Sequence, residues 1–298
     1  MQYNLHRQVD QSIILADFTA LLDALPDEEV WAHHHRGRRG TDPRLVLKLL
    51  AVRFLFGLSS ARTLGIAELL RGALNIDART QFPSDSTLDY RLRSGVLDEL
   101  LERLLALSVA TLEENCVAMD STGFEDTRGH AQVWCTNGKK QPRGWRKAHL
   151  IVGTRSHRVY ALRITAGKDG DAPQAKALLS ACRDRNAAPS QAVGDMSYAS
   201  REIATHAENL GLQPTMHLRD HWKPRSHGHP AWKRMINRAR RKPEAYAKTY
   251  HQRSNVESVN SSWKHRFGSR VAMRTARAQD TEVRFKAVLH NLAQPNAF

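Results

Sequence analysis

The pattern of the chain changes near Asn115, and this change limits the folds open to it. Before this residue, apolar side chains recur at helical spacing. After it, short runs rich in β-branched residues alternate with helical segments. This pattern predicts an all-helical region for residues 1 to about 113 and an α/β sheet layered by helices for the remainder.

The helical region has several clear helix signals. An amphipathic pattern covers about residues 12–25, and Thr41-Asp42-Pro43 supplies an N-cap and an N1 proline for an apolar helix that ends at Gly57. A later short helix carries Arg91 and Arg93. These helices have two interpretations: a helix-turn-helix reader of DNA, or a structural bundle whose arginines are solvated.

Two of the strands predicted after Asn115 end in a carboxylate. The first ends at Asp120 and the second at Asp195. In an open sheet, side chains at the carboxyl ends of neighbouring strands gather at one edge, where ligands bind. The five strand-like runs are Cys116–Asp120, a hairpin formed by Ala148–Thr154 and Arg158–Thr165, Gln191–Asp195, and Pro214–Leu218.

The stretch from Tyr250 to Lys264 predicts a helix with two distinct faces. Tyr250, Arg253, Glu257 and Lys264 fall within an arc of about 60° on an α-helix. This face is either a carboxylate flanked by phosphate-binding groups or a solvated face with an Arg253–Glu257 pair. The other face is apolar and is expected to bury against a core; it comprises Val256, Val259, Trp263 and Phe267. A closing helix is predicted from about Ala276 to Leu292.

Three carboxylates converge if the two strands are neighbours and this helix packs beside them. Asp120, Asp195 and Glu257 would then repel one another unless cations lie between them. Two Mg²⁺ ions would remove that cost and support in-line displacement at phosphorus. The alternative is that each aspartate is only a cap or turn residue.

The charge balance indicates a polyanionic partner. Lys and Arg number 45 against 30 Asp and Glu, which gives a net charge of +15, so nucleic acid is the first candidate. We expect no membrane partner, because there is no 18-residue apolar run and no signal-peptide core. Three widely spaced cysteines fit a reducing cytosol, and the consecutive His33, His34 and His35 do not converge on one ion.

Two basic segments are candidates for DNA contact. Residues 219–242 hold nine Lys or Arg against one acid, with Trp222 and Trp232 among them, and we interpret them as a long loop. Residues 137–147 form a second basic loop. Each segment is either a DNA-binding surface or a solvated connector. The cations selected in them are Lys139, Lys140, Arg146, Lys147, Arg240 and Arg241.

The chain resembles the DDE transposases of prokaryotic insertion sequences. Tyr250-x2-Arg253-x3-Glu257-x6-Lys264 matches the Y-x2-R-x3-E-x6-K signature of that family. Met119-Asp120-Ser121-Thr122-Gly123 resembles its first-aspartate motif, and Gly194-Asp195-Met196-Ser197-Tyr198 its second. The stretch from Asp42 to Arg62 also resembles the helical domain found ahead of that core, so the resemblance covers nearly the whole chain.

The resemblance implies a ribonuclease H-like mixed sheet flanked by helices after a helical N-terminal domain. Asp120, Asp195 and Glu257 would hold two Mg²⁺ ions, with Mn²⁺ as an alternative, while Tyr250, Arg253 and Lys264 hold the phosphates of the transposon end. The implied partners are double-stranded terminal inverted repeats and target DNA, bound by a homodimer in the prokaryotic cytoplasm at the nucleoid. Trp134, Trp145 and Trp222 are candidates for stacking on a flipped base, with structural packing as the alternative.

The implied domains are 1–113, for DNA binding and assembly, and 114–298, for catalysis. Only 61 residues separate Asp195 from Glu257, so the large β-rich insertion that some relatives carry there is absent. The hairpin-forming cleavage associated with those relatives is therefore not expected. Two other functions stay open: a catalytically inactive DNA-binding protein descended from a transposase, and a nuclease that does not join strands.

Overall fold

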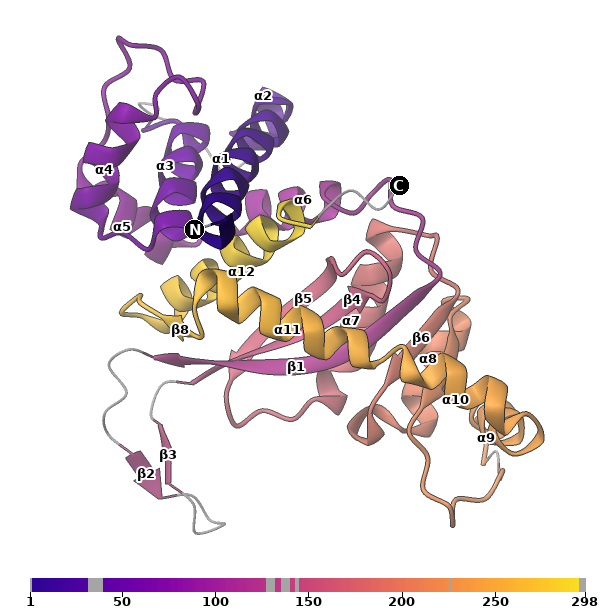
Figure 1. Ribbon diagram of the computed structural model, residues 1–298. Coiled ribbons are helices and arrows are strands. Elements are labelled where there is room, and N and C mark those ends of the chain that lie inside the picture. Colours follow the sequence, from indigo (N-terminus) through magenta and orange to yellow (C-terminus); the bar gives the residue numbers. More distant parts are fainter. Residues whose placement is uncertain are drawn as a thin grey trace. The chain divides into compact units, whose positions relative to one another are not determined.

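The computed structural model describes residues 2–31, 40–126, 132–134, 140–142, 145–225 and 227–294. They form two compact units (Figure 1). One comprises residues 1–108 and 271–295, and the other residues 109–270 and 296–298. None of the described helices has the length and hydropathy that a membrane span requires. His33, His34, His35, Cys135 and Lys139 lie outside the described residues.

The first unit is all-helical, as the apolar spacing predicts. Asp42 accepts a hydrogen bond from the Arg44 N–H at 2.8 Å, and Gly57 ends the same helix with φ of +64°, so the predicted cap and stop are confirmed. The helices of this unit are α1 (Gln2–Asp23), α2 (Asp27–Val30), α3 (Pro43–Phe56), α4 (Ser60–Leu69), α5 (Asp85–Ser94), α6 (Asp98–Leu107) and α12 (Ala276–Leu292).

The closing helix α12 forms where it is predicted, but it packs in the helical unit. Its Phe285 is fully buried, with ring centroids 5.3 Å from Phe18 of α1 and 5.2 Å from Phe54 of α3. Residues 271–295 thus belong to the helical unit, whereas the predicted division assigned them to the domain that starts at residue 114. The apolar stripe of α12 packs on α1 and α3, more than 200 positions earlier in the chain, a pairing that helical periodicity cannot specify.

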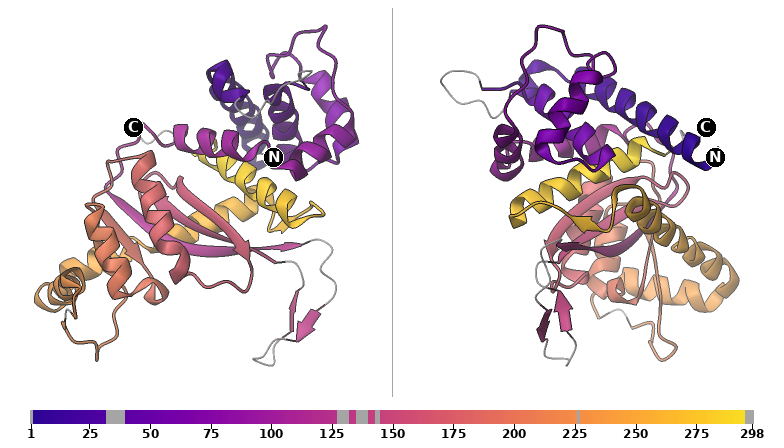
Figure 2. Two further views of the ribbon diagram at one scale, coloured as in Figure 1. Left: turned by 180° about the vertical axis from the view of Figure 1, so that it is seen from behind. Right: turned by 60° about the vertical axis from the view of Figure 1, so that its left-hand side comes forward.

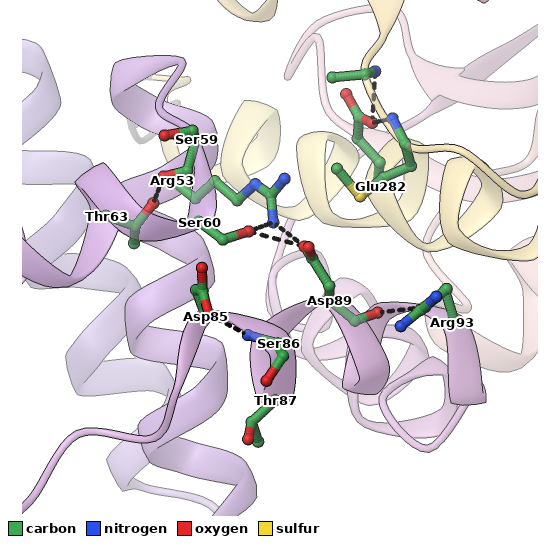
Figure 3. Close-up of polar contacts among 12 residues, drawn as sticks. Arg53, Ser59, Ser60, Thr63, Asp85, Ser86, Thr87, Asp89, Arg93 and Glu282 are labelled. Atoms are coloured by element: carbon green, nitrogen blue, oxygen red, sulfur yellow. Dashed lines mark hydrogen bonds and ion pairs between the residues drawn. The ribbon is translucent and has the colours of Figure 1, made fainter.

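A polar network ties three helices of this unit together (Figure 3). Arg53 of α3 is buried and donates to Asp89 of α5 at 2.8 Å and to Ser60 of α4 at 2.6 Å. Ser60 also donates to Asp89 at 2.7 Å. Burial opposes ionisation of Asp89, but the hydrogen bonds from Arg53 and Ser60 outweigh it and lower the pKa of the carboxyl.

The second unit contains a six-stranded mixed sheet. Its strands are β1 (Cys116–Asp126), β4 (Arg146–Gly153), β5 (Val159–Ala166), β6 (Gln191–Gly194), β7 (Gln213–Met216) and β8 (Arg270–Val271). They lie in the order β5-β4-β1-β6-β7, with β8 paired to β1. The pairs β1–β4 and β4–β5 are antiparallel, while β1–β6 and β6–β7 are parallel. The predicted hairpin and the predicted mixed sheet flanked by helices, a ribonuclease H-like arrangement, are confirmed.

Helices cover both faces of this sheet (Figures 1 and 2). Helix α7 (Ala172–Arg185) packs on β4 and β5, and α8 (Arg201–Asn209) packs on β7. Helix α11 (Ser254–Phe267) runs along β1 on the opposite face. A separate two-stranded hairpin is formed by β2 (Gln132–Trp134) and β3 (Lys140–Pro142), so part of the predicted second basic loop is strand.

Two predictions about the C-terminal half are wrong in detail. Residues 230–241 form helix α9 (Pro230–Arg241) where a loop is predicted, because Ala231, Trp232, Met235 and Ile236 bury one face of it. The single helix predicted over Tyr250–Lys264 is divided between α10 (Pro243–His251) and α11. At the junction the bonds tighten to the i+3 pattern, as in the Arg253 N–H to Tyr250 C=O bond of 2.9 Å.

We predict that Asp89→Asn lowers the free energy of unfolding at pH 7 by about 1–3 kcal/mol, since it removes the charged partner of a buried guanidinium. The folded-state pKa of Asp89 is depressed, so its contribution is present above pH ~4 and is lost as pH falls through the folded-state pKa. Urea denaturation of both proteins at pH 7 and at pH 3 measures this. The control Asp17→Asn changes an exposed acid of α1; an equal effect of both variants would contradict the role of the network.

Candidate active site

The two predicted strand-end aspartates lie side by side. Met119 of β1 pairs with Gly194 of β6 in parallel register, so Asp120 and Asp195 follow at the same level on neighbouring strands. Beyond this level β6 has ended, while β1 continues against β4 as far as Phe124. Asp195 Oδ1 accepts hydrogen bonds from the Ser197 N–H at 2.8 Å and the Ser197 hydroxyl at 2.5 Å.

Asp120 is held in a mixed electrostatic environment. Burial raises the pKa of its carboxyl, and the neighbouring negative charges of Asp195 and Asp171 act in the same direction. The Ser121 N–H and the Arg253 guanidinium oppose them. In addition, Asn260 Nδ2 of α11 donates to Asp120 Oδ2 at 3.1 Å, a contact between residues 140 positions apart.

Helix α11 is anchored by its apolar face, as predicted. The four side chains of this face are buried, and the fully buried Trp263 meets Phe124 of β1 edge to face with ring centroids 5.1 Å apart. This contact fixes the height of the helix along β1. It therefore also sets the level of Asn260 and, one turn earlier, of Glu257.

The Glu257 side chain is turned toward its own helix. Its Oε1 accepts a hydrogen bond from Arg253 Nη1 at 3.0 Å, and 65% of the side chain is exposed. Among the described residues, no group of three or more His, Cys, Asp or Glu side chains is placed to hold a metal ion together. Asp120 and Asp195 are adjacent hard oxygen donors whose mutual repulsion a divalent ion would relieve, so they fit such an ion. Glu257 lies within one helical turn of the contact to Asp120.

Two further signature residues, Lys264 and Tyr250, have aromatic neighbours. Lys264 lies over the Phe124 ring, with Nζ 5.9 Å from the centroid, and burial lowers the pKa of its ammonium group. The Tyr250 ring packs at a tilt against the His217 ring, with ring centroids 5.6 Å apart. A cavity of about 510 Å³ adjoins Tyr250 and is also lined by Trp222, Tyr246 and Arg240.

The basic residues selected from sequence lie in different environments in the structure. Lys147 of β4 contacts Asp171, with Nζ 2.8 Å from Oδ1, and is thus engaged inside the unit. Arg146 opens β4 opposite Phe124. Arg240 donates to the Trp222 C=O at 2.8 Å, and Arg241 is exposed at the end of α9. The side chain of Lys140 lies outside the described part of the chain.

The tryptophan candidates have structural neighbours. Trp222 packs on the buried Trp232 with centroids 5.2 Å apart. Trp145 is 37% exposed and lies against Gly123 of β1, where a Cβ would come within 2.4 Å of its ring. The side chain of Trp134 is not among those that the structure describes. Trp222 and Trp145 thus have packing partners, and stacking on a flipped base stays a prediction for them.

Three residues beside the carboxylates were missed from sequence: Asn260, Asp171 and His149. Asn260 follows Glu257 by three positions, so the helical period could have placed it on the adjoining face. Asp171 precedes Ala172-Pro173, a sequence typical of a helix cap, but its side chain makes no capping bond. No local signal marks His149, which is fully buried.

Comparison with known proteins identifies the family. The family model described as "Transposase DDE domain" matches residues 111–292, more than half of the 298 residues. The chain therefore belongs to the DDE-domain transposases, and the resemblance noted in its motifs is confirmed.

Searches of whole proteins add little to this assignment. No curated protein matches the chain. Among solved structures, a pre-cleavage Mos1 transpososome is 12% identical, covering 76% of this chain and 82% of that one with a TM-score of 0.24. A Mos1 transposase paired-end complex with the left transposon end is 11% identical, covering 80% and 83%, also at 0.24. Scores this low leave the assignment to the family model.

We predict that Trp263→Ala destabilises the protein by about 3–5 kcal/mol, since it leaves a large cavity between α11 and β1. Trp145→Ala, which removes a partly exposed ring, should cost roughly half as much or less. Denaturant unfolding followed by circular dichroism compares the two variants. Equal losses would show that Trp263 is not the main anchor of α11.

Proposed function

We propose that this transposase is encoded by a prokaryotic insertion sequence, binds the terminal inverted repeats of its element, and catalyses DNA cleavage and strand transfer. The observation that carries the proposal is the adjacency of Asp120 and Asp195 on parallel strands, with α11 bonded to Asp120 through Asn260. The helix that carries Glu257 is therefore in contact with Asp120, which supports Glu257 as the third ligand.

In the proposed reaction, water attacks the phosphodiester at the transposon end, and the 3′ oxygen leaves as a free hydroxyl. That hydroxyl then attacks a phosphodiester of target DNA and displaces the 3′ oxygen of the target. Asp120, Asp195 and Glu257 would hold divalent cations, Mg²⁺ or Mn²⁺, which would activate the attacking oxygen and stabilise the leaving one.

The remaining signature residues would bind the DNA backbone. Arg253 lies close enough to Asp120 to oppose the rise in the pKa of that carboxyl, so a phosphate bound by Arg253 would lie beside the carboxylates. Lys264 lies over Phe124 of β1, and Tyr250 of α10 packs against His217, which follows β7. The net charge of +15 would add non-specific attraction, and a homodimer would pair the two ends.

Incubation of purified protein with labelled terminal-repeat DNA and Mg²⁺ tests the proposal. We expect cleavage products with a free 3′ end and, with target DNA present, joined products. Binding without cleavage would instead support the inactive DNA-binding alternative, and cleavage without joining would support a nuclease. Both outcomes contradict the proposed function.

We predict that Asp195→Asn reduces cleavage by at least about 10³-fold while the Kd for terminal-repeat DNA changes less than about threefold, since one site carboxylate is lost and the binding surface stays. Asp184→Asn is the matched control, because Asp184 is an exposed acid near the C-terminal end of α7. A variant at position 195 that cleaves at the normal rate would rule out the assignment.

We also predict that Lys264→Ala weakens binding to any DNA sequence and lowers the slope of log K against log salt by about one, whereas Lys264→Arg keeps the slope. Fluorescence anisotropy between 50 and 300 mM salt, about the range over which phosphate contacts weaken, measures this. An unchanged slope in the alanine variant would show that Lys264 does not contact phosphate.

A further inference from the structure

A fourth carboxylate, Asp171, lies near Asp120 and has no place in the signature of the family. Its Oδ1 is 2.8 Å from Lys147 Nζ and 3.0 Å from His149 Nδ1. The Asp171 side chain is only 21% exposed, and that of His149 is fully buried. Burial opposes ionisation of Asp171, but Lys147 and the Ser121 hydroxyl outweigh it and lower the pKa of the carboxyl.

This cluster links four segments of the catalytic unit. Asp171 lies at the start of α7, while Lys147 and His149 alternate along β4 on one face of the sheet. The other ring nitrogen of His149 lies 2.8 Å from Thr165 Oγ1 on β5. Ser121 of β1 is directly opposite His149 in the antiparallel register.

Ser121 connects the cluster to the active site. Ser121 is the cross-strand partner of His149; its hydroxyl helps to lower the pKa of the Asp171 carboxyl, and its N–H opposes the rise in the pKa of Asp120. Strand β6 stops pairing with β1 at Met119, and from Asp120 to Phe124 β1 pairs with β4, while β8 also pairs with β1. Lys147 and His149 lie on β4, the strand that pairs with this stretch of β1.

We propose that Asp171, clamped by Lys147 and His149, is a positioning residue that acts through Ser121 to fix the segment of β1 carrying the Asp120 carboxylate. The inference rests on the proposed cleavage function. It assigns Lys147 to the clamp, where the sequence favoured DNA contact. A misplaced carboxylate would slow the chemical step without weakening DNA binding.

Single-turnover cleavage by Asp171→Asn, Ser121→Ala and the double variant tests this coupling. We expect each single variant to lose about tenfold in rate, with the Kd for DNA within about twofold of wild type. If both act on one path, the double variant also loses about tenfold, whereas independent sites would multiply to about a hundredfold. Asp169→Asn is the control, since Lys147 contacts only the backbone C=O of Asp169, at 3.2 Å.

Amide hydrogen exchange gives a second readout that does not need activity. Peptides covering residues 116–126 should exchange faster at positions 120–122 in Asp171→Asn and Ser121→Ala than in Asp169→Asn. Normal cleavage by Asp171→Asn, multiplicative losses in the double variant, or unchanged exchange at 120–122 would each overturn the positioning role. A wild type that fails to cleave would overturn the proposed function instead, and the exchange comparison would still decide about Asp171.

Discussion

The burial of Asp120 among other carboxylates is the constraint around which the catalytic unit is arranged. Burial and the charges of Asp195 and Asp171 all disfavour its ionised form. The structure offsets this with a neutral amide from α11, a backbone N–H from β1 and the guanidinium of Arg253. These three groups compensate part of the cost and leave a site that favours a cation.

Much of this edge could be predicted from sequence, because a buried strand that ends in a carboxylate is a local signal. Asp120 and Asp195 were both found in this way, although β1 continues past Asp120 to Asp126; that their two strands are neighbours was only a condition of the prediction, and the parallel pairing meets it. The apolar stripe of α11 could also be predicted, since Val256, Val259 and Trp263 repeat at helical spacing. All three side chains are buried. Local periodicity thus fixed the elements and the faces that they present.

What escaped prediction depends on contacts between distant parts of the chain. Residues 230–241 are basic enough to resemble a loop, but burial of Trp232 and Met235 makes them a helix. The same applies to Asp171, whose local sequence resembles a cap while its partners lie on β4. Contacts of this kind carry no periodic signature, so neither the clamp nor the placement of α12 among the N-terminal helices could be inferred.

Arg253 is the residue at which the two sequence interpretations meet. It forms the i,i+4 pair with Glu257 that a solvated helix face predicts, yet it also lies within electrostatic reach of Asp120. With Glu257 65% exposed, such a pair contributes only about 0.3–0.5 kcal/mol. A charge-assisted bond from Arg253 to a phosphate is worth more, about 1.5–3 kcal/mol. The ion pair is therefore too weak to keep Arg253 from DNA or Glu257 from the aspartates, and it is compatible with the catalytic role proposed for both.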